Sequence, residues 1–137
     1  MSRIINPDNA GKERTRLTKA VVLAIRELGR QTDPGIESRD LAAFIVLALG
    51  IIAKNIDVSV AAWEKRDYWV KADKFRMDWA WAGNLAGRMQ FALLEEDWDG
   101  VALIAGQVAG KLNKVTVPAG HRLGKPWVGA WQQLNQK

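Results

Sequence analysis

The sequence predicts an all-α fold: an up-down four-helix bundle with basic N- and C-terminal extensions that assembles into an oligomer. Apolar residues recur at spacings of three and four in four segments, and no segment shows strand-like alternation of comparable strength. Proline, glycine or capping residues separate these segments. The 137 residues suffice for one core. We therefore divide the chain into a bundle, residues 1–113, and a basic extension rich in Gly, Pro and Trp, residues 114–137.

The first helix is expected to begin near Asn6 and Pro7, which offer a cap and a first turn. Pro34 and Gly35 then interrupt the chain, so the helix must end before them. Its apolar residues form one stripe at helical spacing: Leu17, Val21, Ala24 and Leu28.

The second helix is expected to begin at Ser38, whose hydroxyl can cap it. Its centre, LAAFIVLALGIIA, is apolar on all sides, so it must be covered on more than one side. We expect the other helices to provide part of this cover and a subunit interface to provide the rest. Asp57 can cap a separate helix over VSVAAWEKR, but a continuous helix is equally compatible with these residues.

A long third helix is expected from Tyr68 to Leu94. Its apolar seam, typical of a helical bundle, comprises Trp69, Ala72, Phe75, Trp79, Ala82, Ala86, Met89 and Leu93. Trp69 and Trp79 are therefore expected in the core. Trp63 and Trp81 lie off this seam and are expected to be exposed or at an interface.

The last helix is expected to begin at Asp97, which can act as its cap, with Asp99 in the first turn. Its apolar stripe comprises Val101, Ile104, Val108 and Leu112. The same acidic residues, with Glu95 and Glu96, are one conceivable divalent-cation site, but the start of a capped helix explains them better.

The positive charge is concentrated at the two ends of the chain. Residues 1–30 carry a net charge of +4 and residues 111–137 carry +5, whereas residues 31–110 carry −4. This asymmetry indicates an anionic partner, and the alternative is that basic tails keep an oligomer soluble. Basic residues beside tryptophan suit phosphate contacts and base stacking. The predicted nucleic-acid-binding residues are Lys12, Arg14, Arg16, Lys19, Arg122, Lys125 and Trp127.

Two regions have competing interpretations. In the tail, the tryptophans could dock the extension onto the bundle, a role that is compatible with nucleic-acid contact by the neighbouring basic residues. In residues 64–78, five basic residues alternate with four acidic ones, which is typical of a solvated helix face. We therefore expect Lys71 and Lys74 to contribute less to binding than the terminal cations.

Glycines occur within the predicted helices, where each costs up to about 1 kcal/mol relative to alanine. Close packing against another subunit is the favoured explanation, and a ligand pocket or an engineered surface are the alternatives. The predicted subunit-interface residues are Gly50, Gly83, Gly87, Gly106 and Gly110.

The sequence contains little of the chemistry that an enzyme needs. It has no cysteine, one histidine, His121, and three serines, none in a nucleophile-elbow motif. No glycine-rich phosphate-binding motif occurs either. We predict no enzymatic activity, no cofactor and no metal. The longest apolar run, Leu41 to Ala53, is too short to span a bilayer, and the N-terminus lacks a signal-peptide core, so we expect a cytoplasmic protein without a membrane partner.

The chain resembles a bacterial four-helix-bundle family in three features. These are the stretch EKRDYWVKADKFRMDW, the apolar helix before it, and a last helix that ends in small residues. This family includes the proteins encoded in 23S ribosomal RNA intervening sequences and the Avd accessory proteins of diversity-generating retroelements. The resemblance covers residues 38–113. It implies a homopentamer with a basic surface, which in the retroelement branch binds RNA or DNA and partners a reverse transcriptase. Gly110-Lys111-Leu112 departs from the family's Gly-Gly-aromatic ending.

These observations lead to two main hypotheses. The first is a non-enzymatic, oligomeric accessory protein that binds nucleic acid through basic surfaces. The second is a structural self-assembly module whose small-residue helical faces pack subunits together. A ligand-binding bundle built around the glycine pairs is a third, less favoured hypothesis.

Overall fold

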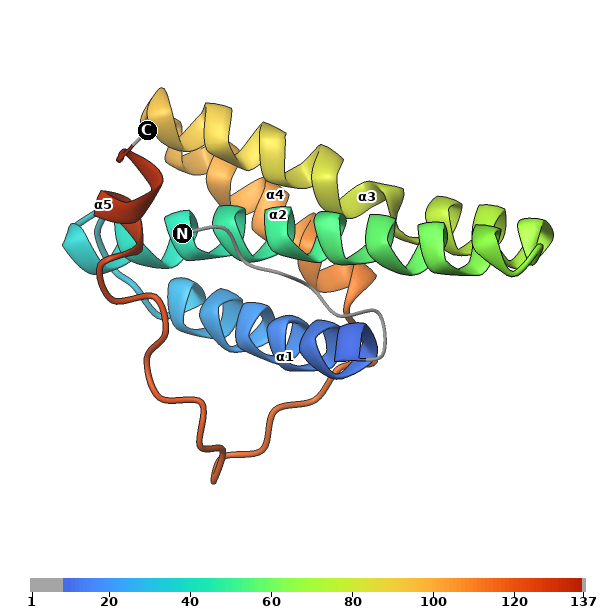
Figure 1. Ribbon diagram of the computed structural model, residues 1–137. Helices are drawn as coiled ribbons and strands as arrows, with labels where there is room; N and C mark the ends of the chain where they lie inside the picture. Colours follow the sequence, from blue (N-terminus) through green and yellow to red (C-terminus); the bar gives the residue numbers. More distant parts are fainter. Residues whose placement is uncertain (1–8, 137) are drawn as a thin grey trace.

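The computed structural model describes residues 9–136, which form five helices and no strand (Figure 1). The helices are α1 (Ala10–Gly29), α2 (Ile36–Lys65), α3 (Trp69–Leu94), α4 (Trp98–Lys111) and the short α5 (Ala130–Leu134). The four long helices pack together, which confirms the all-α, bundle-like architecture. The predicted cap at Asn6 and Pro7 lies outside the described residues.

Helix α2 is one continuous helix of 30 residues, so the second of the two alternatives at Asp57 is confirmed. The expected cap at Ser38 is wrong, because α2 begins two residues earlier, after Gly35. Ser38 lies in the first turn, where its Oγ donates a hydrogen bond to the carbonyl oxygen of Asp33 at 2.7 Å. The hydroxyl therefore ties the preceding turn to the helix.

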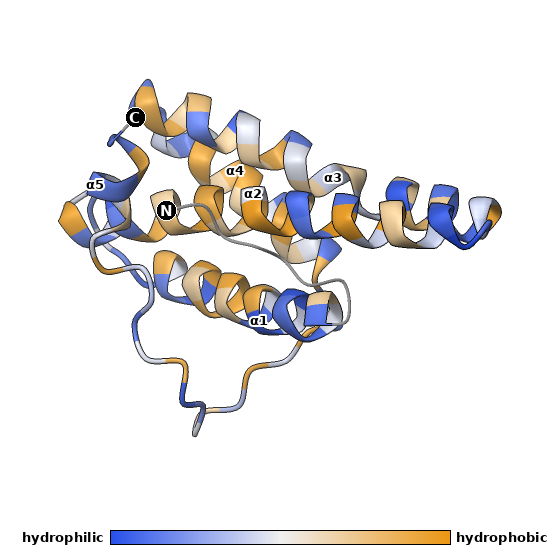
Figure 2. Ribbon diagram, viewed as in Figure 1, coloured by the Kyte–Doolittle hydropathy of each residue, from blue (hydrophilic) through white to orange (hydrophobic). Residues whose placement is uncertain are grey.

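Helix α2 is the central element, and α1, α3 and α5 all pack against it (Figure 1). The largest of its fully buried apolar side chains are Leu41, Ile45, Leu49 and Ile52. Figure 2 shows the hydrophobic residues gathered along this helix. By length and composition alone α2 could cross a membrane, but 56% of its most apolar window is buried, as in a core helix. The docked α5 supplies cover that we expected from another subunit.

The helical stripes of α1 and α4 match the expected core. Leu17, Val21 and Ala24 are buried, with Leu28 partly buried against the same cluster. All four residues of the α4 stripe are buried. The Asp97 cap is confirmed, because its Oδ1 accepts a hydrogen bond from the Gly100 backbone nitrogen at 3.0 Å.

The tryptophans of the long hairpin differ from the prediction. The end of the α2–α3 hairpin extends beyond α1 and α4 (Figure 1), and Trp69 at this end is 56% exposed, so its expected place in the core is wrong. At this end of the hairpin the small seam residue Ala72 is fully buried, whereas the large Trp69 stays exposed because no third helix among the described residues covers the pair there. Trp63 and Trp81, expected to be exposed or at an interface, are partly buried and pack against the core, which argues against full exposure. Trp63 makes an edge contact with Phe75, with ring centroids 4.8 Å apart.

Candidate nucleic-acid interface

A basic groove lies between α1, α3 and the segment that follows α4. Its volume is about 470 Å³. Its walls consist of Arg14, Thr15, Thr18 and Lys19 from α1, Trp79 from α3, and Lys114, Val115, Thr116 and Pro118 from the segment after α4. None of the described residues that line it is acidic. The fold thus brings cations from both basic ends of the chain into one place.

Arg14 is the most constrained of these cations. Its Nη1 donates a hydrogen bond to Oδ1 of Asn55 at 2.7 Å, and its guanidinium lies over the rings of Phe75 and Trp79, 4.8 Å and 5.9 Å from their centroids. Burial lowers the pKa of Arg14 because desolvation disfavours the charged form. An arginine nevertheless stays protonated in proteins, so Arg14 presents a fixed positive charge at the groove.

Asn55 holds this arrangement from the middle of α2. It is fully buried, and its Nδ2 donates a hydrogen bond to the carbonyl oxygen of Ala10 at 2.8 Å. The same side chain therefore anchors the first residue of α1 and the guanidinium of Arg14. Sequence analysis did not identify Asn55, although an amide between apolar positions of a helix is a signal for a buried polar contact.

Lys19 and Lys114 are the groove's accessible cations. Both are exposed, and neither forms an ion pair within residues 9–136. They come from opposite basic ends of the chain, and Lys114 was not among the residues predicted to bind nucleic acid. The hydroxyls of Thr15 and Thr18 are committed to α1, because each donates a hydrogen bond to a backbone carbonyl oxygen of that helix.

Trp79 forms an apolar wall of the groove. It stacks on Trp81, with ring centroids 5.7 Å apart and an interplanar angle of 26°, and it also meets Phe75 and the Arg14 guanidinium. These contacts occupy much of the Trp79 ring and leave little free ring surface for a stacked base. Trp79 is therefore better placed to shield one side of a bound nucleic-acid strand.

Other predicted cations surround the groove or lie apart from it. Lys12 and Arg16 are exposed on α1 at helical spacing from Lys19, so the three share one side of that helix. Arg122 and Lys125 are exposed in the extension and do not line the groove.

The predicted stacking role of Trp127 is wrong, because this residue is only 3% exposed. The alternative, docking of the extension, is confirmed for it: Trp127, Ala130 and Leu134 all join the core cluster. The carboxylate of Asp40 fixes the start of α5 by accepting hydrogen bonds from the backbone nitrogens of Gly129 (3.1 Å) and Trp131 (2.9 Å). Arg39 lies 5.8 Å from the Trp131 ring centroid.

Within the described part of the chain, the predicted interface glycines do not pack against other segments, apart from Gly83. A Cβ at Gly83 would lie 3.6 Å from the Ala53 Cβ, which is ordinary contact. No heavy atom outside the local helix lies within 4 Å of such a Cβ at the other four: Gly50, Gly87, Gly106 and Gly110. Close packing inside the described part of the chain therefore does not explain these four glycines.

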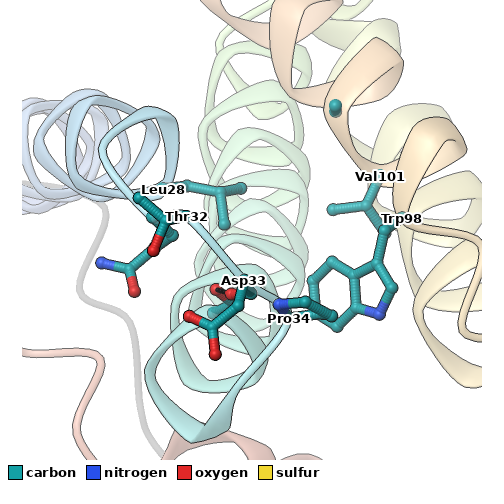
Figure 3. A pocket seen from close by; sticks show the side chains of 9 residues that line it. Leu28, Thr32, Asp33, Pro34, Trp98 and Val101 are labelled. Carbon is teal, nitrogen blue, oxygen red and sulfur yellow. Dashed lines mark hydrogen bonds between the residues drawn. The ribbon is translucent and has the colours of Figure 1, made fainter.

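A smaller pocket, away from the groove, has no basic residue among the described residues that line it. This pocket, of about 220 Å³, lies where the α1–α2 turn meets α4, and Figure 3 shows Trp98 opposite Pro34, with Leu28 and Val101 close by. Asp33 is the single charged residue among the described residues that line this pocket. Within residues 9–136, no group of three histidine or acidic residues is placed to hold a metal ion.

Comparison of the chain with protein-family models, with curated proteins and with solved structures finds no match in any of the three.

Proposed function

We propose that this protein is a non-enzymatic, oligomeric helical-bundle accessory protein that binds nucleic acid through the groove between α1 and the segment after α4. The observation that carries this proposal is the meeting of Lys19 and Lys114, from opposite ends of the chain, on a groove whose described lining contains no acidic residue. Phosphate contacts from lysine and arginine supply most of the sequence-independent affinity for nucleic acid.

The geometry favours contact with a sugar–phosphate backbone. Lys19 and Lys114 can each contact a phosphate, while Lys12 and Arg16 extend the positive surface along α1. Trp79 provides an apolar wall beside them. Because phosphate contacts carry no base information, binding should depend weakly on sequence and strongly on salt.

The positions of the two serines among the described residues support a function without nucleophilic catalysis. Ser38 and Ser59 are buried in α2, and the hydroxyl of Ser38 is bound to the Asp33 carbonyl oxygen. Neither can present a hydroxyl to a substrate in this conformation.

A second candidate function is structural self-assembly. The large side chains of Phe91 and Leu103 are 67% and 62% exposed on α3 and α4, beside glycines that meet nothing in their own subunit. The resemblance noted above implies five subunits and a reverse transcriptase partner. Both stay predictions, and equilibrium sedimentation and co-purification with a reverse transcriptase would test them.

The nucleic-acid proposal is tested with two double variants of equal charge change. Lys19→Gln/Lys114→Gln removes the accessible groove cations. The control, Lys71→Gln/Lys74→Gln, removes one lysine that lies 4.6 Å from the Trp63 ring centroid and one that pairs with Asp78 at 3.0 Å. Fluorescence anisotropy with single-stranded RNAs of mixed sequence should show a larger loss of affinity for the groove variant. An equal or larger loss of affinity for the control would contradict the proposal and indicate that RNA binds to the α2–α3 hairpin.

A further inference from the structure

The end of the α2–α3 hairpin exposes three consecutive aromatic or aliphatic side chains. Tyr68 is 53% exposed, Trp69 56% and Val70 84%. They lie where the hairpin extends beyond α1 and α4 (Figure 1). Exposed apolar residues that adjoin one another indicate a contact surface, whereas single scattered ones do not.

The backbone of this turn satisfies its own hydrogen-bond donors. The backbone nitrogens of Arg66 and Tyr68 each donate to the carbonyl oxygen of Trp63 at 3.0 Å, and that of Asp67 donates to Glu64 at 3.0 Å. Asp67 closes the turn with a φ of 62°. Since these three donors do not depend on water, the turn can enter a less polar environment at a lower free-energy cost.

Three cations flank the exposed apolar side chains. Lys65, Arg66 and Lys71 are exposed, and none of them forms an ion pair within the described part of the chain. Asp67 is the one acidic residue in residues 65–71, so this segment carries a net charge of +2. We call residues 65–71 the hairpin tip.

The acidic residues that follow or precede the hairpin tip are neutralised within the protein. Arg76 pairs with Glu64 at 2.8 Å and also with Asp73. Lys74 pairs with Asp78 at 3.0 Å. The net positive charge of the tip therefore remains available to an anionic surface.

We propose that the hairpin tip binds the surface of a lipid bilayer that contains anionic phospholipids. Trp69 and Val70 enter the boundary between the headgroups and the acyl chains, and Lys65 and Arg66 contact headgroup phosphates. Tryptophan and tyrosine favour this boundary because each combines an apolar ring with a polar N–H or O–H group. Each basic residue near an anionic bilayer raises the affinity roughly fivefold.

Shape and composition favour a bilayer over a protein or a nucleic acid as the occupant. A projecting tip can enter a deformable lipid layer, whereas a protein partner would need a hollow of matching shape. The aliphatic side chain of Val70 is the most exposed of the three and offers nothing to a phosphate or a base, but it gains free energy in an apolar environment.

This contact is peripheral and is separate from the nucleic-acid groove. The sequence led us to expect no membrane partner, because its longest apolar run is too short to span a bilayer. Binding to a bilayer surface needs no spanning segment, so α2 stays in the core of the bundle.

Co-sedimentation of the full chain with vesicles tests the proposal. The wild type should bind vesicles of mixed phosphatidylcholine and phosphatidylserine more tightly than vesicles of phosphatidylcholine alone. Trp69→Ser/Val70→Ser and Lys65→Gln/Arg66→Gln should each lower the affinity for the mixed vesicles roughly tenfold or more. Circular dichroism checks that each variant is folded.

The matched control for the apolar residues is Ile36→Ser/Val128→Ser. These two side chains are 83% and 72% exposed, and they lie away from the tip, at the start of α2 and before α5. This control should bind the mixed vesicles as the wild type does.

Quenching of tryptophan fluorescence by brominated phosphatidylcholine, included in the mixed vesicles, reports which ring meets the acyl chains. The quenching should fall in Trp69→Phe and persist in Trp131→Phe, which lies in α5.

A loss of vesicle binding in both tip variants, with binding retained in the control, would support the proposal. A wild type that does not bind the mixed vesicles, or tip variants that bind as the wild type does, would overturn it. A loss in Lys19→Gln/Lys114→Gln at least as large as in the tip variants would also overturn it, because the bilayer would then meet the basic groove.

Discussion

Replacing Asn55 by leucine removes the polar link between α2 and the start of α1 while nearly preserving side-chain size. The change breaks the bond to the Ala10 carbonyl oxygen, worth about 1 kcal/mol, and the bond from the charged Arg14, worth about 1.5–3 kcal/mol. Because Asn55 is fully buried, water cannot replace it without rearrangement. We therefore expect a loss of about 3 kcal/mol in the free energy of unfolding, or roughly 10 °C in Tm.

The assay is urea unfolding followed by circular dichroism, at one protein concentration because self-association changes apparent stability. A double-mutant cycle with Arg14→Met should give a coupling energy of about 1–2 kcal/mol, since the two side chains are bonded. Arg16→Met, a change at an exposed arginine on the same helix, should be additive with Asn55→Leu within about 0.5 kcal/mol. A loss below about 1 kcal/mol, or additivity with Arg14→Met, would refute the proposed link.

Three further predictions concern the turns, the extension and the helical glycines. Glu96 has a φ of 54°, in the left-handed region, so Glu96→Gly should raise stability by about 1 kcal/mol in thermal unfolding. Glu96→Ala is the control: it loses the same exposed ion pair with Arg39 but keeps a Cβ, so it should not raise stability. Asp40→Ala removes the cap of α5 and should cost about 1 kcal/mol, seen as faster proteolysis within residues 114–137; unchanged cleavage would argue against this anchor. Gly106→Ala should stabilise the monomer by up to about 1 kcal/mol through helix propensity. Gly106→Leu should weaken self-association, and an unaffected assembly would remove Gly106 from the interface.

The helices could be predicted from the sequence because local periodicity reports which side of each helix is buried. The stripes of α1 and α4 and the Asp97 cap follow from residues within a few positions of one another. Trp69 could not be placed correctly in this way, since its exposure depends on where α1 and α4 stop along the α2–α3 hairpin. The spacing of apolar residues identifies which side of a helix faces its partner. It does not indicate how far along the hairpin the neighbouring helices extend.

The candidate groove was only partly predictable. The concentration of positive charge at both ends of the chain indicated an anionic partner, and Lys19 lies in the resulting groove. The contribution of Lys114 required the three-dimensional path that brings residues 114–118 beside α1. Burial of Trp127 likewise depends on the long-range bonds from the start of α5 to Asp40. No local spacing reports such contacts between distant segments.

The most direct test of the central claim is the salt dependence of RNA binding by the wild type and by the Lys19→Gln/Lys114→Gln variant. If both lysines contact phosphates of a single strand, their loss should reduce the slope of log affinity against log salt by about 1.4, or about 0.7 for each contact. The Lys71→Gln/Lys74→Gln variant should retain a slope close to that of the wild type. Equal slopes for the wild type and the groove variant, or a wild type with no measurable affinity for RNA at low salt, would contradict the assignment of this groove as a nucleic-acid interface.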